Sequence, residues 1–165
     1  MIRPAPRPAL PGDTERLATL YRESYSALMA DAYPAAVLDA ALGPMTGVNA
    51  ALIASGRYFV IEEGRRILAA GGWSPHPPAR EDGEAHIRHF ATHPAALGRG
   101  HGSAIMRLCL AQAEAEGIAA LACYASLNAE GFYARHGFAV RARREIPIRG
   151  VAFPVVEMVR TPRRP

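Results

Sequence analysis

The chain has 165 residues, of which 50% are hydrophobic and 21% are charged, a composition typical of a globular protein and not of a disordered or fibrous one. The formal net charge is +4 at pH 7, which is compatible with an anionic ligand. No apolar run in the sequence approaches the roughly 20 residues that cross a bilayer, so a membrane protein is not expected.

The length predicts a single domain over residues 1–165, because a chain of this size buries about two-thirds of its unfolded surface without disulfides. The N-terminal residues lack the apolar core of a signal sequence, and we therefore expect a cytoplasmic protein. Two cysteines, Cys109 and Cys123, fall in apolar segments, where a free thiol usually behaves as a small buried hydrophobe.

The basic residues are scattered, apart from one group on a late segment and one in the tail. These are Arg141, Arg143 and Arg144, followed by Arg160, Arg163 and Arg164. Aromatic residues do not interleave with them, as they do on a surface that stacks nucleic-acid bases. We therefore expect no nucleic-acid partner.

The N-terminal third is predicted to be mainly helical. After a short strand-like opening, Pro11-Gly12-Asp13 is typical of a turn and helix cap, and apolar residues at helical spacing continue to about Met29. A second helix is expected over residues 35–42, with Gly43-Pro44 as its stop, and a third over residues 47–54.

The apolar period then changes to that of strands. Runs at 58–61 and 67–70 flank Glu62-Glu63-Gly64-Arg65, which predicts a hairpin. Residues 74–83 contain three prolines and are expected to form a loop. Residues 84–93 are predicted to form a further strand.

The remaining chain alternates between the two periods. It predicts a helix that ends at Gly117, a strand over 118–124, a helix through His136, and strands near 139–148 and 151–159. Pro147 and Pro154 suggest an edge, a bulge or strand ends in the last pair. The order of elements indicates an α/β fold with a mixed sheet.

A glycine-rich turn between the fourth strand and the long helix is the most informative segment. It reads Leu97-Gly98-Arg99-Gly100-His101-Gly102-Ser103-Ala104. Glycines at alternate positions let main-chain N–H groups converge on one point, where the helix adds the positive end of its dipole. The turn therefore predicts a phosphate site, the alternative being a simple connection between strand and helix.

Two other phosphate-binding motifs do not fit this turn. A dinucleotide fingerprint needs a third glycine where Ser103 stands, and a nucleoside-triphosphate loop needs a lysine followed by serine or threonine.

The order of elements and this turn resemble the GNAT superfamily of acyl-CoA-dependent N-acetyltransferases. The family signature has Gln or Arg, two residues, Gly, one residue, and Gly or Ala; residues 97–102 match it except for Leu97 in the first position. A second match follows in Asn128-Ala129, Phe132-Tyr133 and Gly137-Phe138. The resemblance implies a mixed, mostly antiparallel sheet flanked by helices on both faces.

The resemblance also implies where acetyl-CoA binds. Main-chain N–H groups of residues 97–104 would hold the pyrophosphate, with Arg99 as an ionic partner. The main chain of Phe90, Ala91 and Thr92 would bind the pantetheine amides where their strand separates from its neighbour. Asn128 would contact the pantetheine arm and cap the following helix.

Acetyl transfer also needs an acid for the departing thiolate and a route for the amine proton. Tyr133 occupies the position of the family's general acid, and we therefore expect it to protonate the thiolate; a free thiol ionises at about pH 8.5 and a phenol at about pH 10. Packing against Phe132 and Phe138 is its alternative role. His86, with Glu84 on the same face, is the candidate base, although a water chain serves instead in many relatives.

The resulting hypothesis is an N-acetyltransferase that moves an acetyl group from acetyl-CoA to a primary amine. The acceptor stays open between small molecules and protein amines, and the segments expected to shape its pocket are 21–33, 73–83 and 149–154. Tyr25, Tyr33 and Trp73 either line that pocket or pack in the core. The alternative function is a non-catalytic acyl-CoA-binding module.

Two further expectations concern metals and assembly. No metal is expected, because the strand spacing of His86, His89 and His93 prevents all three from reaching one ion. Exposed final strands are surfaces through which subunits can pair, so a homodimer is expected.

Overall fold

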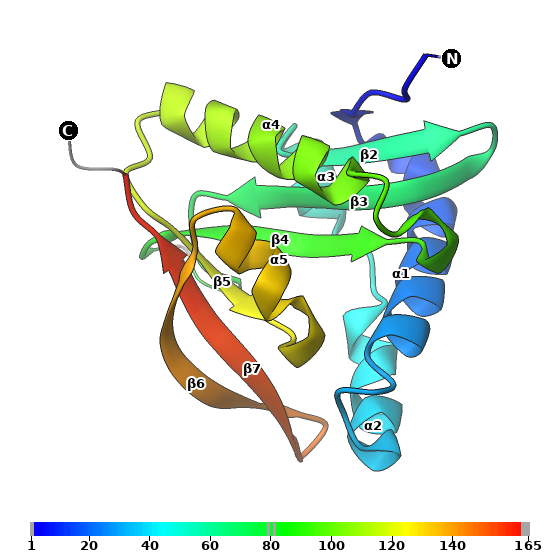
Figure 1. Cartoon of the computed structure of the whole chain (residues 1–165), viewed down its shortest axis with the longest axis vertical. Helices are drawn as coiled ribbons and strands as arrows, with labels where there is room; N and C mark the ends of the chain where they lie inside the picture. Colours follow the sequence, from blue (N-terminus) through cyan, green and yellow to red (C-terminus); the bar gives the residue numbers. More distant parts are fainter. Residues whose placement is uncertain (1, 79, 81, 163–165) are drawn as a thin grey trace.

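A computed structural model describes residues 2–78, 80 and 82–162, whose strands form one mixed sheet. The strand order is β1-β2-β3-β4-β5-β7-β6, and β4 and β5 are the parallel pair (Figure 1). The strands are β1 (Arg7–Pro8), β2 (Tyr58–Glu63), β3 (Arg66–Ser74), β4 (Ala85–Thr92), β5 (Leu121–Ala125), β6 (Ala139–Ile148) and β7 (Val151–Arg160). The predicted α/β class and mostly antiparallel sheet are confirmed.

Helices cover both faces of this sheet. They are α1 (Thr14–Leu28), α2 (Ala35–Met45), α3 (Ala50–Ala54), α4 (His101–Ala115) and α5 (Glu130–Arg135), with 3₁₀ turns η1 (Pro11–Asp13), η2 (Pro94–Ala96) and η3 (Leu127–Ala129). In the part of the chain that the structure describes, no helix is long and apolar enough to cross a membrane.

Successive residues of the central strands point to opposite faces of the sheet and belong to two separate hydrophobic cores, as the two-residue period of a strand requires. Val60 and Ala70 belong to the core that α1, α2 and α3 cover, whereas Phe59, Ile61 and Ala69 belong to the core under α4 and α5. The predicted core positions of the cysteines are confirmed, and burial raises the pKa of each thiol to about 12.

The prediction that α2 stops at Gly43-Pro44 is wrong, because the helix continues to Met45. A proline normally bars the helical conformation in the residue before it, since its ring clashes with that residue's Cβ. Gly43 has no Cβ, so the clash is relieved. Pro44 also lies in the last turn, where the Thr46 N–H still reaches the Leu42 carbonyl at 3.0 Å.

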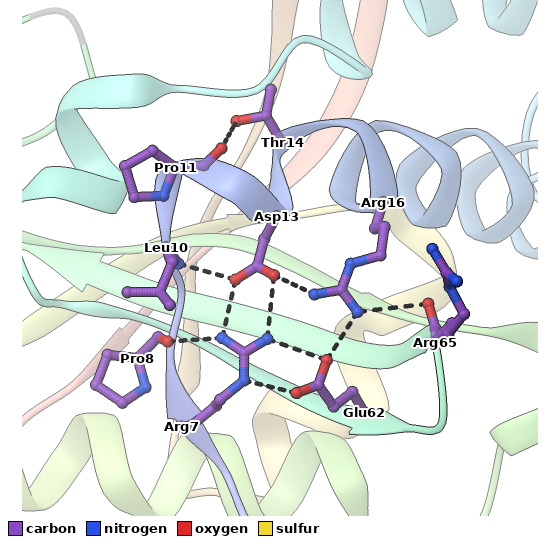
Figure 2. A network of polar contacts seen from close by, with 9 residues as sticks. All are labelled: Arg7, Pro8, Leu10, Pro11, Asp13, Thr14, Arg16, Glu62 and Arg65. Atoms are coloured by element: carbon purple, nitrogen blue, oxygen red, sulfur yellow. Dashed lines mark hydrogen bonds and ion pairs between the residues drawn. The ribbon is translucent and has the colours of Figure 1, made fainter.

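Asp13 stands at the N-cap position of α1, as predicted, but its side chain makes no cap hydrogen bond and its carboxylate points back toward β1 and β2 (Figure 2). It accepts from the Leu10 N–H at 2.8 Å and pairs with Arg7 at 2.9 Å and with Arg16. Both arginines also pair with Glu62 at 2.8 Å. These contacts join β1, α1 and β2, and the arginines hold the pKa of both carboxyl groups at about 2.

Replacing Asp13 with asparagine is expected to lower the melting temperature at pH 7 by about 3–10 °C, since hydrogen bonds to two charged partners weaken. A carboxyl group with a depressed pKa stabilises the fold above its unfolded pKa of about 3.9, and this contribution is lost as the pH falls toward the folded value. The difference in melting temperature between the parent and Asp13→Asn should therefore become smaller below about pH 4. Asp82→Asn, which alters an exposed pair with Arg80, is the control in thermal melts across this pH range.

Candidate active site

The central feature of the sheet is the separation of β4 from β5. The two strands pair only where Ala85 faces Leu121 and His86 faces Ala122, and beyond these positions they diverge (Figure 1). Side chains and main chain on both sides of the gap line a cleft of about 940 Å³. Since the C-terminal end of β4 leads into the glycine-rich turn, the gap opens toward that turn.

A bulge in β4 lies along the gap. Ala70 pairs with Ala91 and Gly72 with Arg88, so His89 and Phe90 together lie opposite Gly71. His89 has a φ of 48°, in the left-handed region, and its carbonyl accepts from the Tyr58 hydroxyl at 2.7 Å. A bulge of this kind bends its strand and increases the local twist. The bulge therefore helps β4 to turn away from β5.

Most of the residues predicted for the site line this one cleft. They are His86, Phe90, Ala91, Thr92, Leu97, Gly98, Gly100, His101, Gly102, Ser103, Asn128 and Tyr133. Arg99 and Ala104 do not line it: the Arg99 guanidinium pairs with Glu63 at 3.2 Å, and the Ala104 N–H is bonded to the Gly100 carbonyl at 3.0 Å.

The glycine-rich turn presents main-chain donors to the cleft. Gly98 and Gly100 have φ values of 73° and 81°, which favour glycine, and α4 begins immediately afterwards. The N–H groups of His101, Gly102 and Ser103 lie in the first helical turn, where a helix has no internal partner for its donors. Together with the helix dipole, these groups form a site for an anion.

Two arginines near this end of the cleft were not predicted from the sequence as site residues. The Arg3 guanidinium donates to the Arg99 carbonyl and lies so close to Gly100 that a Cβ there would be 2.7 Å from it. Arg135, on α5, lines the cleft. No local spacing could reveal Arg3, because it is brought to the turn by the path of the N-terminal segment alone.

Asn128 lies within η3 and not at the start of a helix. Ser126 and Ala129 occupy the cap positions of η3 and α5, and neither makes a side-chain cap bond. The described residues give the Asn128 amide no hydrogen-bond partner, so it faces the cleft without the capping role that was predicted.

Tyr133 enters the cleft from the face of the sheet that α4 and α5 cover. Its ring packs edge-on against Phe132 at 5.2 Å and against Phe138 at 5.7 Å between centroids, so the predicted packing role is present. Its hydroxyl has no hydrogen-bond partner among the described residues. Burial raises its pKa well above 10, which keeps the phenol protonated.

His86 enters from the opposite face. Its neighbours Ala85 and Ile87 belong to the core under α4, so the alternation of the strand directs His86 toward the α1 side. The ring lies 5.2 Å from that of Tyr124, and its Nδ1 is buried without a partner among the described residues. Burial lowers its pKa, so the imidazole is neutral at pH 7 and able to accept a proton.

The aromatic residues considered for an acceptor pocket separate into two groups. Tyr25 lines the cleft, whereas Trp73 is buried in the core and donates to Gln112 at 2.8 Å. Tyr33 is also buried; its hydroxyl donates to the Pro154 carbonyl at 2.7 Å and accepts from the Leu127 N–H at 2.9 Å. In the predicted pocket segment 73–83, residues 79 and 81 lie outside the described part of the chain.

The basic group on β6 is engaged in ion pairs. Arg141 pairs with Glu84 and Glu157, and Arg144 pairs with Glu157. Of the tail arginines, residues 163 and 164 lie outside the described residues. Within the described ranges, no group of three or more His, Cys, Asp or Glu side chains could hold a metal ion.

Comparisons with known proteins agree with this geometry. Residues 15–138 match the model of the acetyltransferase (GNAT) family. No curated protein matches the chain by sequence.

Among solved structures, the chain is similar to a GCN5-related N-acetyltransferase of Rhodopseudomonas palustris, with 25% identity over 98% of both chains and a TM-score of 0.81. It shares its fold with the PaiA N-acetyltransferase of Thermoplasma acidophilum in complex with coenzyme A, at 15% identity, 98% and 100% coverage of this and that chain, and a TM-score of 0.73. It also shares its fold with a GNAT family acetyltransferase of Brucella melitensis in complex with acetyl-CoA. The identity is 20%, the match covers 99% of this chain and 92% of the other, and the TM-score is 0.60.

The bulge provides a test of the shape of the cleft. A Cβ on Gly71 would lie 2.6 Å from the Phe90 ring, so Gly71→Ala must displace that ring and is expected to destabilise the protein by about 1–3 kcal/mol. The double variant Gly71→Ala/Phe90→Leu should recover part of this loss in urea unfolding. Additive losses in the double variant would mean that the two residues do not compete for the same space.

Proposed function

Because the chain belongs to the acetyltransferase (GNAT) family, we propose that it transfers an acetyl group from acetyl-CoA to the primary amine of an acceptor. The observation that carries this proposal is one continuous cleft that joins the glycine-rich turn to Tyr133 and His86. We also propose that the whole chain serves as one such domain.

The turn suits the diphosphate of the acyl donor. Main-chain N–H groups in the first turn of α4, for which a helix has no internal partner, would donate to the phosphate oxygens. The Arg3 guanidinium, which donates to the Arg99 carbonyl beside the turn, would add positive charge. Leu97, where the family carries Gln or Arg, is 51% exposed, and the proposed phosphate contacts come from main-chain N–H groups that do not depend on its side chain. The relatives solved with coenzyme A and acetyl-CoA support this assignment.

The pantetheine arm would lie in the gap between β4 and β5. The His93 N–H is bonded to the Leu68 carbonyl of β3 at 2.8 Å, and strand residues alternate in the direction of their main-chain groups. Thr92 therefore directs its N–H and C=O groups toward β5, which has already diverged, and the Phe90 carbonyl points the same way because it lies trans to the Ala91 N–H. These free groups can pair with the two amides of the arm.

Two protein groups would handle protons on opposite faces of the sheet. His86 would accept a proton from the amine, directly or through water, as the nitrogen attacks the thioester carbon. Tyr133 would donate to the sulfur as the carbon–sulfur bond breaks. The amine thus loses one proton and the thiol gains one, so the transfer balances without a further reactant.

The raised pKa of Tyr133 changes the role expected from the sequence. A phenol is already a weaker acid than a thiol, by about 1.5 pKa units or about 2 kcal/mol, and burial widens this difference. Complete transfer to a free thiolate is therefore unfavourable. Tyr133 would instead stabilise the developing charge by a hydrogen bond, and transfer its proton only as a second proton reaches its own oxygen.

Binding of the donor can be tested with two glycines of matched backbone strain. Gly98 and Gly117 have φ values of 73° and 77°, and a Cβ at either would meet nothing within 4 Å. Valine at each position should lower the melting temperature to a similar degree. In calorimetric titration with acetyl-CoA, only Gly98→Val is expected to weaken binding, by about 10-fold or more. Equal affinities in the two variants would contradict a phosphate site at the turn.

Catalysis can be tested by removing a single oxygen. Tyr133→Phe is expected to reduce kcat by about 100-fold or more, since an acid acting in the transition state contributes at least that much. Its affinity for acetyl-CoA should stay within about 3-fold, because the ring remains. Thiol release in the presence of an amine panel measures the rate, and equal rates in both proteins would remove Tyr133 from the mechanism.

A further inference from the structure

The side of the cleft that faces α1 and α2, where His86 lies, contains an arginine, Arg88. It forms no ion pair with any of the described residues. Arg88 lies on β4 two residues after His86 and therefore on the same face, about 6.6 Å further along the strand. It is partly buried and lines the cleft. One guanidinium nitrogen, Nη1, donates to the Ser74 hydroxyl at 3.2 Å, and the described residues offer its other donors no partner.

From this geometry we propose that Arg88 binds a carboxylate of the acceptor, which makes the acceptor a small amine of the amino-acid class. The inference rests on the proposed acetyl transfer and adds the chemical class of the acceptor. A guanidinium matches a carboxylate with two parallel hydrogen bonds, and it keeps its charge when partly buried.

The two acidic residues whose charges act on the neighbouring His86 are already paired elsewhere. Glu84 pairs with Arg141, and Glu157 pairs with Arg141 and Arg144. Burial lowers the pKa of Arg88, and no carboxylate of the described residues opposes this effect. A partly buried cation without an anion is costly, and a substrate carboxylate would remove that cost.

The charge of the whole cleft agrees with this assignment. Its lining, as far as the structure describes it, includes Arg88 and Arg135 but no aspartate or glutamate. A polyamine acceptor would carry several ammonium groups into a cleft without an acid to receive them. A nearby guanidinium also lowers the pKa of the acceptor's own ammonium, so the neutral amine needed for attack forms more readily.

Apolar side chains form most of the remaining wall on this side, which also includes Ser24. They come from α1 and the residue that follows it, from α2, β6 and β7, and include Leu28, Met29, Met45, Ile146, Ile148 and Phe153. Such walls leave the carboxylate as the polar group by which an acceptor is oriented. Amino acids with apolar side chains are therefore the appropriate probes.

The test compares leucine, methionine and phenylalanine with their carboxamides and with 1,4-diaminobutane, by thiol release from acetyl-CoA. The parent is expected to prefer each free acid to its amide. Arg88→Met should raise KM for the acids by about 10- to 100-fold, leave kcat within about 3-fold and leave the amides unaffected. Arg88→Lys, which keeps the charge without the planar fork, should recover part of the loss. Arg107→Met, on the exposed face of α4, is the matched control.

The outcomes separate the two proposals. Amides or the diamine acetylated as well as the acids, or an unchanged KM in Arg88→Met, would overturn the carboxylate site and leave acetyl transfer standing. Absence of acetylation with every amine, despite acetyl-CoA binding, would overturn both. Should Arg88→Met fail to fold, inhibition of the parent by propionate decides the case: competition with the amine supports the site, and its absence, with propionamide as control, overturns it.

Discussion

Strands β4 and β5 share hydrogen bonds only at their first two residues, and the space that opens beyond His86 gives the molecule its cleft. A parallel pair that continued to the end of β5 would fill this space with its own main chain. The bulge at His89 and Phe90 bends β4 at the same level, and the absence of a Cβ on Gly71 leaves room for the Phe90 ring. The glycine-rich turn, the free main-chain groups and the catalytic candidates all depend on this divergence.

Because the sheet is open at this point, the cleft connects two faces that carry different chemistry. The face covered by α4 and α5 contributes the helix N-terminus, Arg135 and Tyr133, which suit a phosphorylated donor and its leaving sulfur. The face covered by α1 and α2 contributes His86 and Arg88. Donor and acceptor can thus approach one reacting carbon from opposite sides of the sheet, which keeps their binding groups from competing for the same space.

Burial governs the protonation of the groups in this cleft. It lowers the pKa of His86 and brings that of His89 to about 4, so both rings are neutral near pH 7. It raises the pKa of Tyr133, which therefore carries its proton. The same desolvation that makes a neutral base available also makes the phenol a poor complete proton donor. The hydrogen bond to sulfur that we propose for Tyr133, with coupled proton movement, would satisfy both constraints.

Sequence alone determined the order of elements, the mixed sheet, the glycine-rich turn before α4 and a set of the residues that line the cleft, from His86 on β4 to Tyr133 on α5. These features depend on the spacing of residues that are near in sequence. Strands show alternation of apolar residues, α1 and α4 show helical periodicity, and glycines occur where the main chain must be free of side chains. The extension of α2 through Pro44 does not follow from the usual effect of proline on the residue before it, because Gly43 has no Cβ to clash with the ring.

Only the tertiary structure decided which charges remain free in the site. Arg99 stands within the signature but pairs with Glu63, whereas Arg3, far away in sequence, reaches the turn. Arg88 is indistinguishable from other strand arginines until its face and its partners are known. The physical reason is that ion pairs and burial form between distant segments, so the spacing of neighbours along the chain carries no information about them.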